Sequence, residues 1–457
     1  MKKTLTVVFF FFCTTTIIIF SYGFKVPAFI GSPSLQLTQK NALGKGAVGI
    51  EQFGAKANDP KFDNAPAIIK ALNAASVVII PAHKNFTILS PIQVENLASK
   101  TLIATNSTII NRNYDARTFL FINCSAIKIE GGLYTRDVLP TIQNGKAQST
   151  IGFQNCKNIT VTHVHINGSP EMGIDNNIVI GGMYSYNIIE HCLRDGIYAH
   201  YSANLNYIAN SLNEIKDDAL SMHDYGLDNQ KTMLHQAGFT QAGHSVIKYN
   251  KISNSVQGIS SIGCTDLLIA DNDISKTVNA GICIFNSEDL YPNSTARVKN
   301  ISILNNRLIS TGFSVLVNTL DVENNAQNAS GRSAIFVACN RQGQSFTTSA
   351  MRSSNVSVLN NTVSNCAVNG ITLYNIDGVF MKGNRLLNCH SDTKNSPEAT
   401  GDIAEVINCT KMDISGNEIV DNRKVPLHKD GYYIKNSTGK FLQGTTKGFL
   451  GKPVIKL

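Results

Sequence analysis

The sequence predicts an all-β fold: a single-stranded right-handed parallel β-helix, or solenoid, with an N-terminal capping helix. From about residue 100 to 420, short apolar strands alternate with Asn and Gly, and no helical pattern interrupts them. The same phrases return after 22 or 23 residues, a length that suits one turn of a coil. A flat antiparallel sandwich is the alternative, but it predicts a turn roughly every 8–12 residues and leaves the constant step unexplained.

Two recurring phrases define the step. In the first, apolar-x-x-Asn-x-apolar, Asn250 and Asn272 lie 22 residues apart, and Asn361 and Asn384 lie 23 apart. Asn suits such bends because it tolerates left-handed backbone and can hydrogen-bond to its copy on the next turn. The second phrase, x-Gly-Ile or an equivalent, begins at Met172, Asp195, Asp218, Gln257, Ala280 and Asn369. Longer steps predict inserted loops at about 224–243, 286–299, 317–354 and 390–402.

The first residues have the pattern of an export signal. Lys2 and Lys3 lead into an apolar run that is followed by small residues, so we expect a signal peptide over 1–23 and a lead-in over 24–45. An uncleaved membrane anchor is the alternative, because the run could almost span a bilayer. No other stretch approaches membrane length. The mature chain is therefore expected to be secreted, periplasmic or at the cell surface, and outside the membrane after signal cleavage.

Residues 46–420 are expected to form the β-helix domain, closed at its first turn by a helix. This helix is predicted over about 66–75, with Asp63 or Asn64 as its N-cap and a proline in its first turn. The run Val-Val-Ile-Ile at 77–80 then predicts a buried strand. Such a lid is needed because the open edge of a coil otherwise invites aggregation.

The formal net charge of +8 is concentrated at the two ends of the chain. Two positive charges belong to the predicted signal peptide. Residues 421–457, the expected basic C-terminal tail or cap, hold eight Lys and Arg against two Asp. The remaining residues 24–420 are therefore close to neutral, and no aromatic residues interleave with basic ones to stack bases. We expect a monomer without a nucleic-acid partner.

The cysteines predict buried thiols and no structural metal. Ten are present, and removal of Cys13 with the signal leaves nine, an odd number. Their common place in the repeat predicts compact buried side chains at one bend of each turn. No Cys-x-x-Cys pair occurs, so zinc is not expected. The cysteines at this place are Cys124, Cys156, Cys264 and Cys409.

One phrase that contains Asp and His occurs twice. Residues 195–200 read Asp-Gly-Ile-Tyr-Ala-His, and residues 218–223 read Asp-Ala-Leu-Ser-Met-His, so equivalent residues are 23 apart. In a coil these copies would lie ~4.8 Å apart on neighbouring turns. With Ile197 and Leu220 pointing inward, the alternate side chains share the solvent side with the aspartates and with Asp217. These expected outward residues are Tyr198, His200, Ser221 and His223.

Several segments resemble a known group of enzymes. Residues 53–56, Phe-Gly-Ala-Lys, and 78–81, Val-Ile-Ile-Pro, resemble the opening of pectin-lyase-like β-helix enzymes. Residues 166–170, Ile-Asn-Gly-Ser-Pro, resemble the Asn-Ser-Pro rung of family 28 glycoside hydrolases, the polygalacturonases. From Asp195 onward, Asp-Gly-Ile resembles their Asn-Thr-Asp-Gly signature, and Asp-Asp-Ala-Leu at 217–220 resembles their Asp-Asp-Cys-Ile.

The resemblance covers roughly residues 46–290 and departs from the family's pattern at three places. The Asn-Thr before the first aspartate is Leu193-Arg194 here. The family's histidine in Gly-His-Gly-x-Ser-Ile-Gly aligns with Gln257. The Arg-Ile-Lys that holds the substrate carboxylate aligns near residues 280–285, where both cations are missing. These departures argue against activity on polygalacturonate and leave hydrolysis of another sugar chain open.

By the family's pattern, Asp218 is the general acid, and Asp195 and Asp217 handle water and inversion. Glycoside hydrolysis needs one carboxylic acid to protonate the leaving oxygen and one carboxylate to activate water. Neighbouring carboxylates repel, which raises the pKa of one of them. A single aspartate is also typical of a turn, but three in register with two histidines favour the catalytic interpretation. The expected substrate-binding side chains are Arg194, Tyr198, His200, Ser221, His223 and Gln257.

Two other functions stay open. A polysaccharide lyase or uronate epimerase on the same fold would need a positive charge that neutralises the uronate carboxylate. This charge could come from calcium bound by the carboxylates around Asp218 and Asp224, or from a cation such as Arg194. A non-catalytic carbohydrate-binding β-helix is the third class. A hydrolase is expected to need no cofactor and no metal. For zinc, His200 and His223 have only Asp224 as a clear third ligand.

Overall fold

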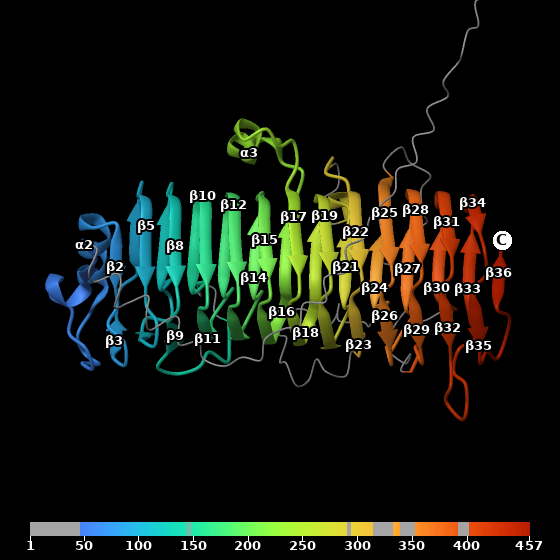
Figure 1. Cartoon of the computed structure of the whole chain (residues 1–457), viewed down its shortest axis with the longest axis horizontal. Helices are drawn as coiled ribbons and strands as arrows, with labels where there is room; N and C mark the ends of the chain where they lie inside the picture. Colours follow the sequence, from blue (N-terminus) through green and yellow to red (C-terminus); the bar gives the residue numbers. More distant parts are fainter. Residues whose placement is uncertain are drawn as a thin grey trace, which may run out of the picture.

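The computed structural model describes residues 46–457 apart from 144–145, 147, 290–293, 314–331, 339–351 and 392–401. Its strands lie side by side and wind into one elongated right-handed parallel β-helix (Figure 1). The ladders between the described strands are parallel, which confirms the predicted fold and excludes the antiparallel sandwich. The expected signal peptide and lead-in, residues 1–45, lie outside the described residues.

The coil has three strand faces, which we call faces A, B and C in chain order. Face A consists of β1 (Val48–Gly49), β2 (Val77–Ile79), β5 (Ala98–Ile103), β8 (Ser125–Glu130), the second parts of β10 (Ile151–Thr162) and β12 (Ile174–Ser185), β15 (Ala203–Ile208), β17 (Gly243–Lys248), β19 (Thr265–Ala270), β22 (Lys299–Leu304), β25 (Ser353–Leu359), β28 (Ile376–Lys382), β31 (Thr410–Ser415) and β34 (Gly439–Phe441). Face B consists of β3 (Asn85–Ile88), β6 (Thr108–Asn111), β9 (Leu133–Arg136), β11 (His165–Ser169), β13 (Ile188–Cys192), the first parts of β16 (Ser211–His223) and β18 (Lys251–Ile262), β20 (Asp273–Thr277), β23 (Arg307–Thr311), β26 (Thr362–Ser364), β29 (Arg385–Leu387), β32 (Glu418–Val420) and β35 (Thr445–Lys447). Face C consists of β4 (Ile92–Glu95), β7 (Phe119–Ile122), the first parts of β10 and β12, β14 (Ile197–His200), the last parts of β16 and β18, β21 (Ile282–Phe285), β24 (Ile335–Ala338), β27 (Ile371–Tyr374), β30 (Asp402–Ile407), β33 (Asp430–Lys435) and β36 (Val454–Lys456).

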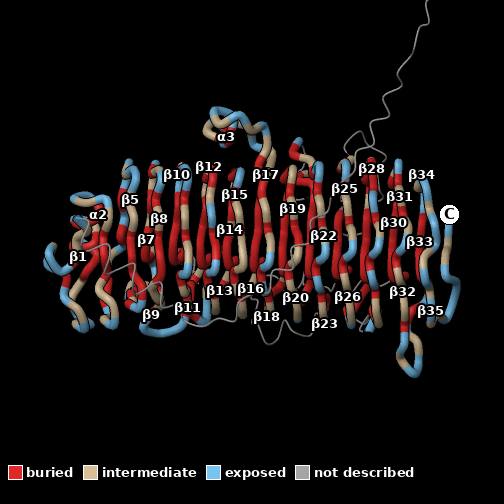
Figure 2. Tube along the Cα trace, viewed as in Figure 1, coloured by how far each residue is buried: buried red, intermediate tan, exposed pale blue. Residues whose placement is uncertain are grey.

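A single apolar core fills the interior of the coil along its length. Inward side chains stack at equal register positions on face C, as Ile174, Ile197, Leu220 and Ile259 do on four successive turns. Figure 2 shows the buried residues running through every turn, with exposed residues on the outside. Burial of this apolar surface, at roughly 25 cal/mol per Å², is the main stabilising contribution.

A ladder of buried asparagines runs along one bend of the coil. In one step, Asn250 donates from Nδ2 and from its backbone N–H to Oδ1 of Asn272, at 2.9 and 3.0 Å. This confirms the predicted bonding between copies on neighbouring turns. The left-handed backbone falls one residue earlier than expected, for example at Asn305 and Asn360, with φ of 54° and 56°. The ladder consists of Asn187, Asn210, Asn250, Asn272, Asn306, Asn361, Asn384 and Asn417.

The described cysteines are buried free thiols, as expected for compact bend residues. The four that share one place in the repeat also share one contact, because each Sγ lies within hydrogen-bond distance of the carbonyl oxygen two residues earlier. For Cys124 and Cys264 these distances are 3.3 and 3.5 Å. The contact repeats at Cys156 and Cys409.

The predicted capping helix is present as α2 (Ala65–Ala74) after η1 (Ile50–Phe53). Asn64 is the N-cap residue, and the Asp63 carboxylate accepts the backbone N–H of Ala65 at 3.1 Å. The buried side of the helix, including Ile68 and Leu72, packs on the core at the open end of the first turn. Among the described helices, none has the length and apolar character needed to cross a bilayer.

The coil continues beyond residue 420, where the sequence placed its end. β33–β36 pair in parallel with β30, β31, β32 and β33. Residues 421–457 therefore contain the last turns of the solenoid, and the expectation of a separate tail from residue 421 was wrong. Their strands are short and rich in Lys, and this pattern is also typical of a solvated chain end.

We expect Asn272→Ala to lower the free energy of unfolding by about 3 kcal/mol, because it leaves buried polar groups without partners. The Asn272 side chain bonds to Asn306 and to the carbonyl of Ile247, and it accepts two bonds from Asn250. Thermal and urea unfolding would measure the loss. Asn73→Ala, on the exposed side of α2, is the matched control and should change stability by less than about 0.5 kcal/mol. Equal effects of the two changes would contradict the role of the ladder.

Candidate functional site

Three aspartates meet where the chain passes from face B to face C. Asp195 lies two residues before β14, and Asp217 and Asp218 lie inside β16, where the ladder to β18 shifts register. Strand β14 pairs with the end of β16 so that Ile197 faces Leu220. Because these two residues point into the core, the predicted alternation holds for their outward neighbours Tyr198 and Ser221. Alternation does not place the aspartates, which lie before these residues. Hydrogen bonds with the outward residues Ser221 and Ser260 place the carboxyl groups of Asp195 and Asp218 on the outer side.

Hydrogen bonds hold two of the carboxyl groups in place. The Ser221 hydroxyl donates to Oδ2 of Asp195, and the side chains of Ser260 and Gln257 bond to Asp218. Within the described residues, Oδ1 of both aspartates is buried and has no hydrogen-bond partner. Unpaired buried carboxyl oxygens are costly to stability, and such atoms cluster at functional sites.

Burial raises the pKa of these aspartates. It raises the pKa of Asp195 to about 7, with a further contribution from the negative charge of Asp217. The pKa of Asp218 is raised well above its ordinary value by burial, and the charges of Asp217 and Asp195 add to the rise. For Asp217, burial also raises the pKa, while the positive charge of Arg194 opposes it. Burial and the two neighbouring carboxylates therefore favour the protonated form of Asp218.

The expectation of a solvent-exposed acidic patch was wrong in degree. Asp195 is 1% exposed and Asp218 is 5% exposed, while about a fifth of the Asp217 side chain, 21%, is accessible. Ser221 and His223 are buried as well. Alternation along the strand identified the outer side correctly, but it does not reveal which rings and inserted segments pack over that side.

Aromatic rings pack beside the carboxyl groups. The ring of Tyr198 lies edge-on to that of His223, with centroids 5.2 Å apart, and the ring of His200 lies 4.9 Å from that of Tyr225. Tyr201 stacks on His200 at 4.1 Å. His200 and His223 occupy equal positions on neighbouring turns, as predicted. The cluster forms a ring-lined surface next to the aspartates.

The two histidines are neutral at pH 7. Burial lowers the pKa of His200 to about 4. Burial lowers the pKa of His223 to about 3, and the positive charges of protonated His200 and of Arg194 add to this effect. The Nε2 atom of His223 lies 3.8 Å from the Asp218 carboxyl group. Both rings can therefore exchange hydrogen bonds with a hydroxyl group, and neither supplies a positive charge for an anion.

Sequence reasoning missed a second group of charges beside the site. Asp175 is 8% exposed and forms an ion pair with Arg117 at 2.8 Å. Glu171 lies 3.9 Å from Arg194, which in turn lies 3.9 Å from Asp217. The signal for Asp175 was available, because it is 23 residues before Tyr198 and pairs with it in register. Arg117 carried no such signal, because it lies outside the repeated phrases.

The turn at residues 280–285 lacks the cations of the polygalacturonase pattern, as expected. Its outward residues Cys283 and Phe285 join a small apolar cluster with Phe336. One cation approaches from elsewhere in the chain, because the guanidinium of Arg332 lies 4.9 Å from the ring of Phe285 and 5.4 Å from that of Phe336. Arg332 is only 5% exposed, so its charge is largely shielded from a solute in the cleft.

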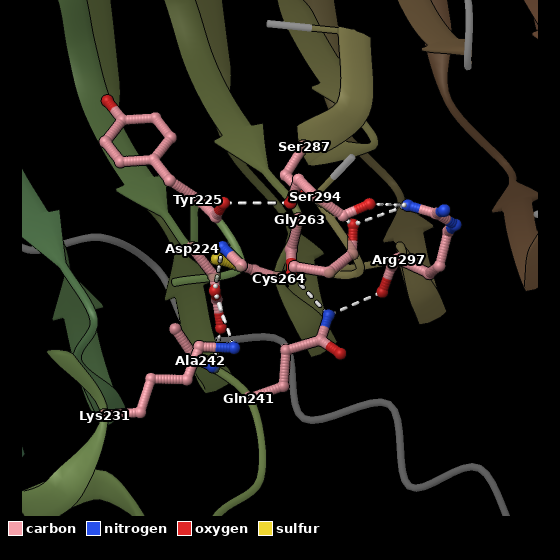
Figure 3. Close-up of polar contacts among 12 residues, drawn as sticks. Asp224, Tyr225, Lys231, Gln241, Ala242, Gly263, Cys264, Ser287, Ser294 and Arg297 are labelled. Atoms are coloured by element: carbon pink, nitrogen blue, oxygen red, sulfur yellow. Dashed lines mark hydrogen bonds and ion pairs between the residues drawn. The ribbon is translucent and has the colours of Figure 1, made fainter. Parts of the chain in front are cut away.

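The predicted insert after His223 is confirmed, and a buried ion pair fixes it (Figure 3). Asp224 is fully buried, Lys231 is 3% exposed, and Lys231 Nζ lies 3.0 Å from Asp224 Oδ1. The same carboxylate accepts the backbone N–H of Gly226 at 2.8 Å and that of Ala242 at 2.9 Å. One side chain thus holds both ends of the segment that carries η2 (Asp228–Gln230) and α3 (Thr232–Gln236).

A second predicted insert, between β21 and β22, is bonded to the first (Figure 3). It begins with η3 (Ser287–Asp289), and the Ser294 hydroxyl donates to the carbonyl of Tyr225 at 2.8 Å. Gln241 donates to the carbonyls of Gly263 and Arg297. The two segments therefore form one wall beside the His223 turn. The other two expected inserts, 317–354 and 390–402, lie largely outside the described residues.

Asp224 does not serve as the third metal ligand considered from the sequence. Both of its oxygens bond to Lys231, Gly226 and Ala242. Within the part of the chain that the structure describes, no group of three or more His, Cys, Asp or Glu side chains is arranged to hold a metal ion.

Comparison with known proteins gives a fold and no family. No family model and no curated protein matches this sequence. The catalytic unit of a GH87 alpha-1,3-glucanase from Streptomyces thermodiastaticus is 17% identical with a TM-score of 0.59, over 90% of this chain and 69% of that one. The family 28 exopolygalacturonase of Yersinia enterocolitica is 12% identical with a TM-score of 0.61, over 87% and 79%. At these identities the likeness shows the right-handed parallel β-helix alone.

We expect Asp224→Asn to lower the free energy of unfolding by about 3 kcal/mol, because buried Lys231 then loses its charged partner. The insert at 224–242 should also become more sensitive to proteolysis. Thermal unfolding and limited proteolysis with mass mapping would measure both effects. Glu418→Gln, which removes an exposed ion pair with Arg385, is the matched control and should have little effect. An insert that stays resistant in Asp224→Asn would contradict the role of the pair.

A second prediction concerns the pH dependence of stability. The pKa of Asp195 is raised in the folded state, so the folded protein binds this proton more tightly than the unfolded chain does. The contribution of Asp195 to the free energy of unfolding is therefore fully present below about pH 4 and is lost as pH rises through about 7. Asp195→Asn should therefore be more stable than wild type by a few kcal/mol at pH 8 and should lose less stability between pH 5 and pH 8. Melting temperatures across this range test it, with exposed Asp137→Asn as control. A variant as pH-sensitive as wild type would refute the assignment.

Proposed function

We propose that the chain is an exported polysaccharide-active enzyme, a glycoside hydrolase that uses Asp195, Asp217 and Asp218. The observation that supports it most is the cluster of buried carboxyl groups with raised pKa values on the outer side of a parallel β-helix. Raised pKa values at unpaired, buried carboxyl groups mark sites where a proton is kept available for chemistry. Solved structures with this fold include a GH87 alpha-1,3-glucanase and a family 28 exopolygalacturonase.

Asp218 is the general acid of this proposal. Burial and the neighbouring carboxylates raise its pKa and so favour the protonated form, and its Oδ1 has no partner among the described residues. A protonated carboxyl group in this state can donate to the glycosidic oxygen as the bond to the leaving sugar breaks. Gln257, which replaces the family's histidine, orients the carboxyl group through a hydrogen bond.

Asp217 is the base of this proposal, and Asp195 assists it. Asp217 is the most accessible of the three carboxylates, and Arg194 favours its charged form. Its carboxylate can take a proton from the water that attacks the sugar. Asp195 accepts a hydrogen bond from Ser221 on one oxygen, which leaves the other to hold the same water.

The ring cluster binds sugar in this proposal. Tyr198, His200 and His223 present flat apolar surfaces and neutral polar atoms, a combination that suits the C–H faces and hydroxyl groups of a saccharide. The export signal at 1–23 and the monomeric state complete the proposal. They rest on the sequence, where the basic start and apolar run are typical of secreted proteins.

We expect Asp218→Asn to lower the rate of polysaccharide cleavage by roughly 10²- to 10⁴-fold, because an amide N–H is not acidic enough to protonate the leaving oxygen. Release of reducing ends from a panel of neutral and acidic polysaccharides measures this, and Asp137→Asn is the matched control. Equal rates for wild type and Asp218→Asn would remove the catalytic assignment. A product with new ultraviolet absorbance would indicate a lyase, and binding without any product would indicate a carbohydrate-binding protein.

A further inference from the structure

An open groove of about 680 Å³ lies between the η2–α3 insert and the bends that join faces C and A, at the other end of the face C strands from the aspartates. Figure 1 shows α3 standing above this edge of the coil near β10, β12 and β15. The groove has a concentration of side-chain amides. These are Asn123, Asn155, Asn177, Asn229, Gln230 and Gln236.

The lining is hydrophilic and almost uncharged. Hydroxyl groups of Ser125 and Thr232 accompany the amides, and Lys157 is the single charged side chain among the lining residues. In the described part of the chain, the six amide side chains make no hydrogen bond to protein groups. Each amide offers donors and an acceptor, which matches the hydroxyl groups of a sugar. Met233 and Ile178 add apolar surface for the C–H face of a sugar ring.

The register of the coil relates the groove to the ring cluster of the candidate site. Asn177 pairs in register with His200, and His200 pairs with His223. Asn155 is the bend residue two turns before Tyr201, and both have positive φ, 53° and 45°. With ~4.8 Å between turns, the amides lie about one to three turns from the ring cluster. A chain of a few sugar units can therefore occupy the groove and reach the aspartates.

The charges of the site disfavour an acidic chain. Glu171 and Asp175 add two carboxylates to the three aspartates, and the nearby cations Arg117 and Arg194 lie against these carboxylates. The histidines on the path between groove and aspartates are neutral. A uronate polymer would bring like charges together in a partly buried cleft. A neutral chain avoids this cost.

We propose that this groove holds part of the substrate, and that the substrate class is a neutral, hydroxyl-rich glycan chain. The inference rests on the proposed function and names the substrate of the same site. The Asp224–Lys231 pair fixes the insert in place, so the groove exists before the glycan arrives. Preformed sites lose less conformational freedom on binding, which favours affinity.

Binding to the full-length Asp218→Asn chain tests this without cleavage of the ligand. The probes are hexasaccharides of alpha-1,3-glucan, beta-1,3-glucan and alpha-1,4-glucan, compared with hexagalacturonate by calorimetry. At least one neutral probe should bind more tightly than hexagalacturonate. Adding Asn177→Ala and Gln236→Ala should weaken that binding roughly 10- to 30-fold, because hydrogen bonds to two amides are lost. Gln443→Ala, an exposed amide near the last turns, is the control and should leave affinity unchanged.

The outcomes separate this inference from the proposed function. Preference for hexagalacturonate, or an affinity that the two alanine changes leave unaltered, overturns the groove assignment, whatever the enzyme activity. Neutral binding that the alanine changes weaken supports the groove even if wild type and Asp218→Asn release equal amounts of product. Asp195→Asn offers a second background should Asp218→Asn melt below the assay temperature. Melting curves of all variants exclude a trivial loss of fold.

Discussion

The register between parallel strands is the constraint on which the site depends. Each turn must place equal positions above one another, or the core side chains and the asparagine ladder lose their partners together. The same register that aligns Ile197 with Leu220 also aligns His200 with His223. Side chains far apart in sequence are therefore held at a spacing that no loop could maintain alone. The stability of the coil and the geometry of the site have one cause.

That stability allows the coil to keep groups that destabilise it. Asp195 and Asp218 are nearly buried, carry unpaired oxygens, and have pKa values raised by burial and by neighbouring carboxylates. Isolated in a small domain, such a cluster would consume much of the folding free energy. Here many turns of apolar core surround it. The strain is local, and it marks the place where the chain departs from what folding alone requires.

The repeat made most of the fold predictable from the sequence, together with one part of the site. The step of 23 residues gave the parallel ladders, the asparagine ladder and the inserts after His223 and Phe285. The step of 23 residues could not predict how deeply the aspartates are buried, because their exposure depends on which rings and inserts fold back over the strand. Arg117 and Arg332 could not be predicted either, since their partners are close in space and distant in the chain, whereas Asp175 lies on the 23-residue step and was overlooked. The turns within residues 421–457 were not predicted, because their many basic residues indicated a solvated end and their apolar alternation is weak.

A solenoid can accept an insertion between turns without losing its register, and this separates specificity from folding. β15 pairs with β17 although 19 residues, 224–242, intervene between β16 and β17. The insert closes on itself through Asp224, so it adds a wall while the ladder on either side continues unchanged. Equivalent bends two to four turns earlier carry amides, and the wall turns that row into a groove. In the proposed enzyme, the aspartates lie on the repeated turns, whereas the groove proposed to select the glycan is formed by the insert between turns.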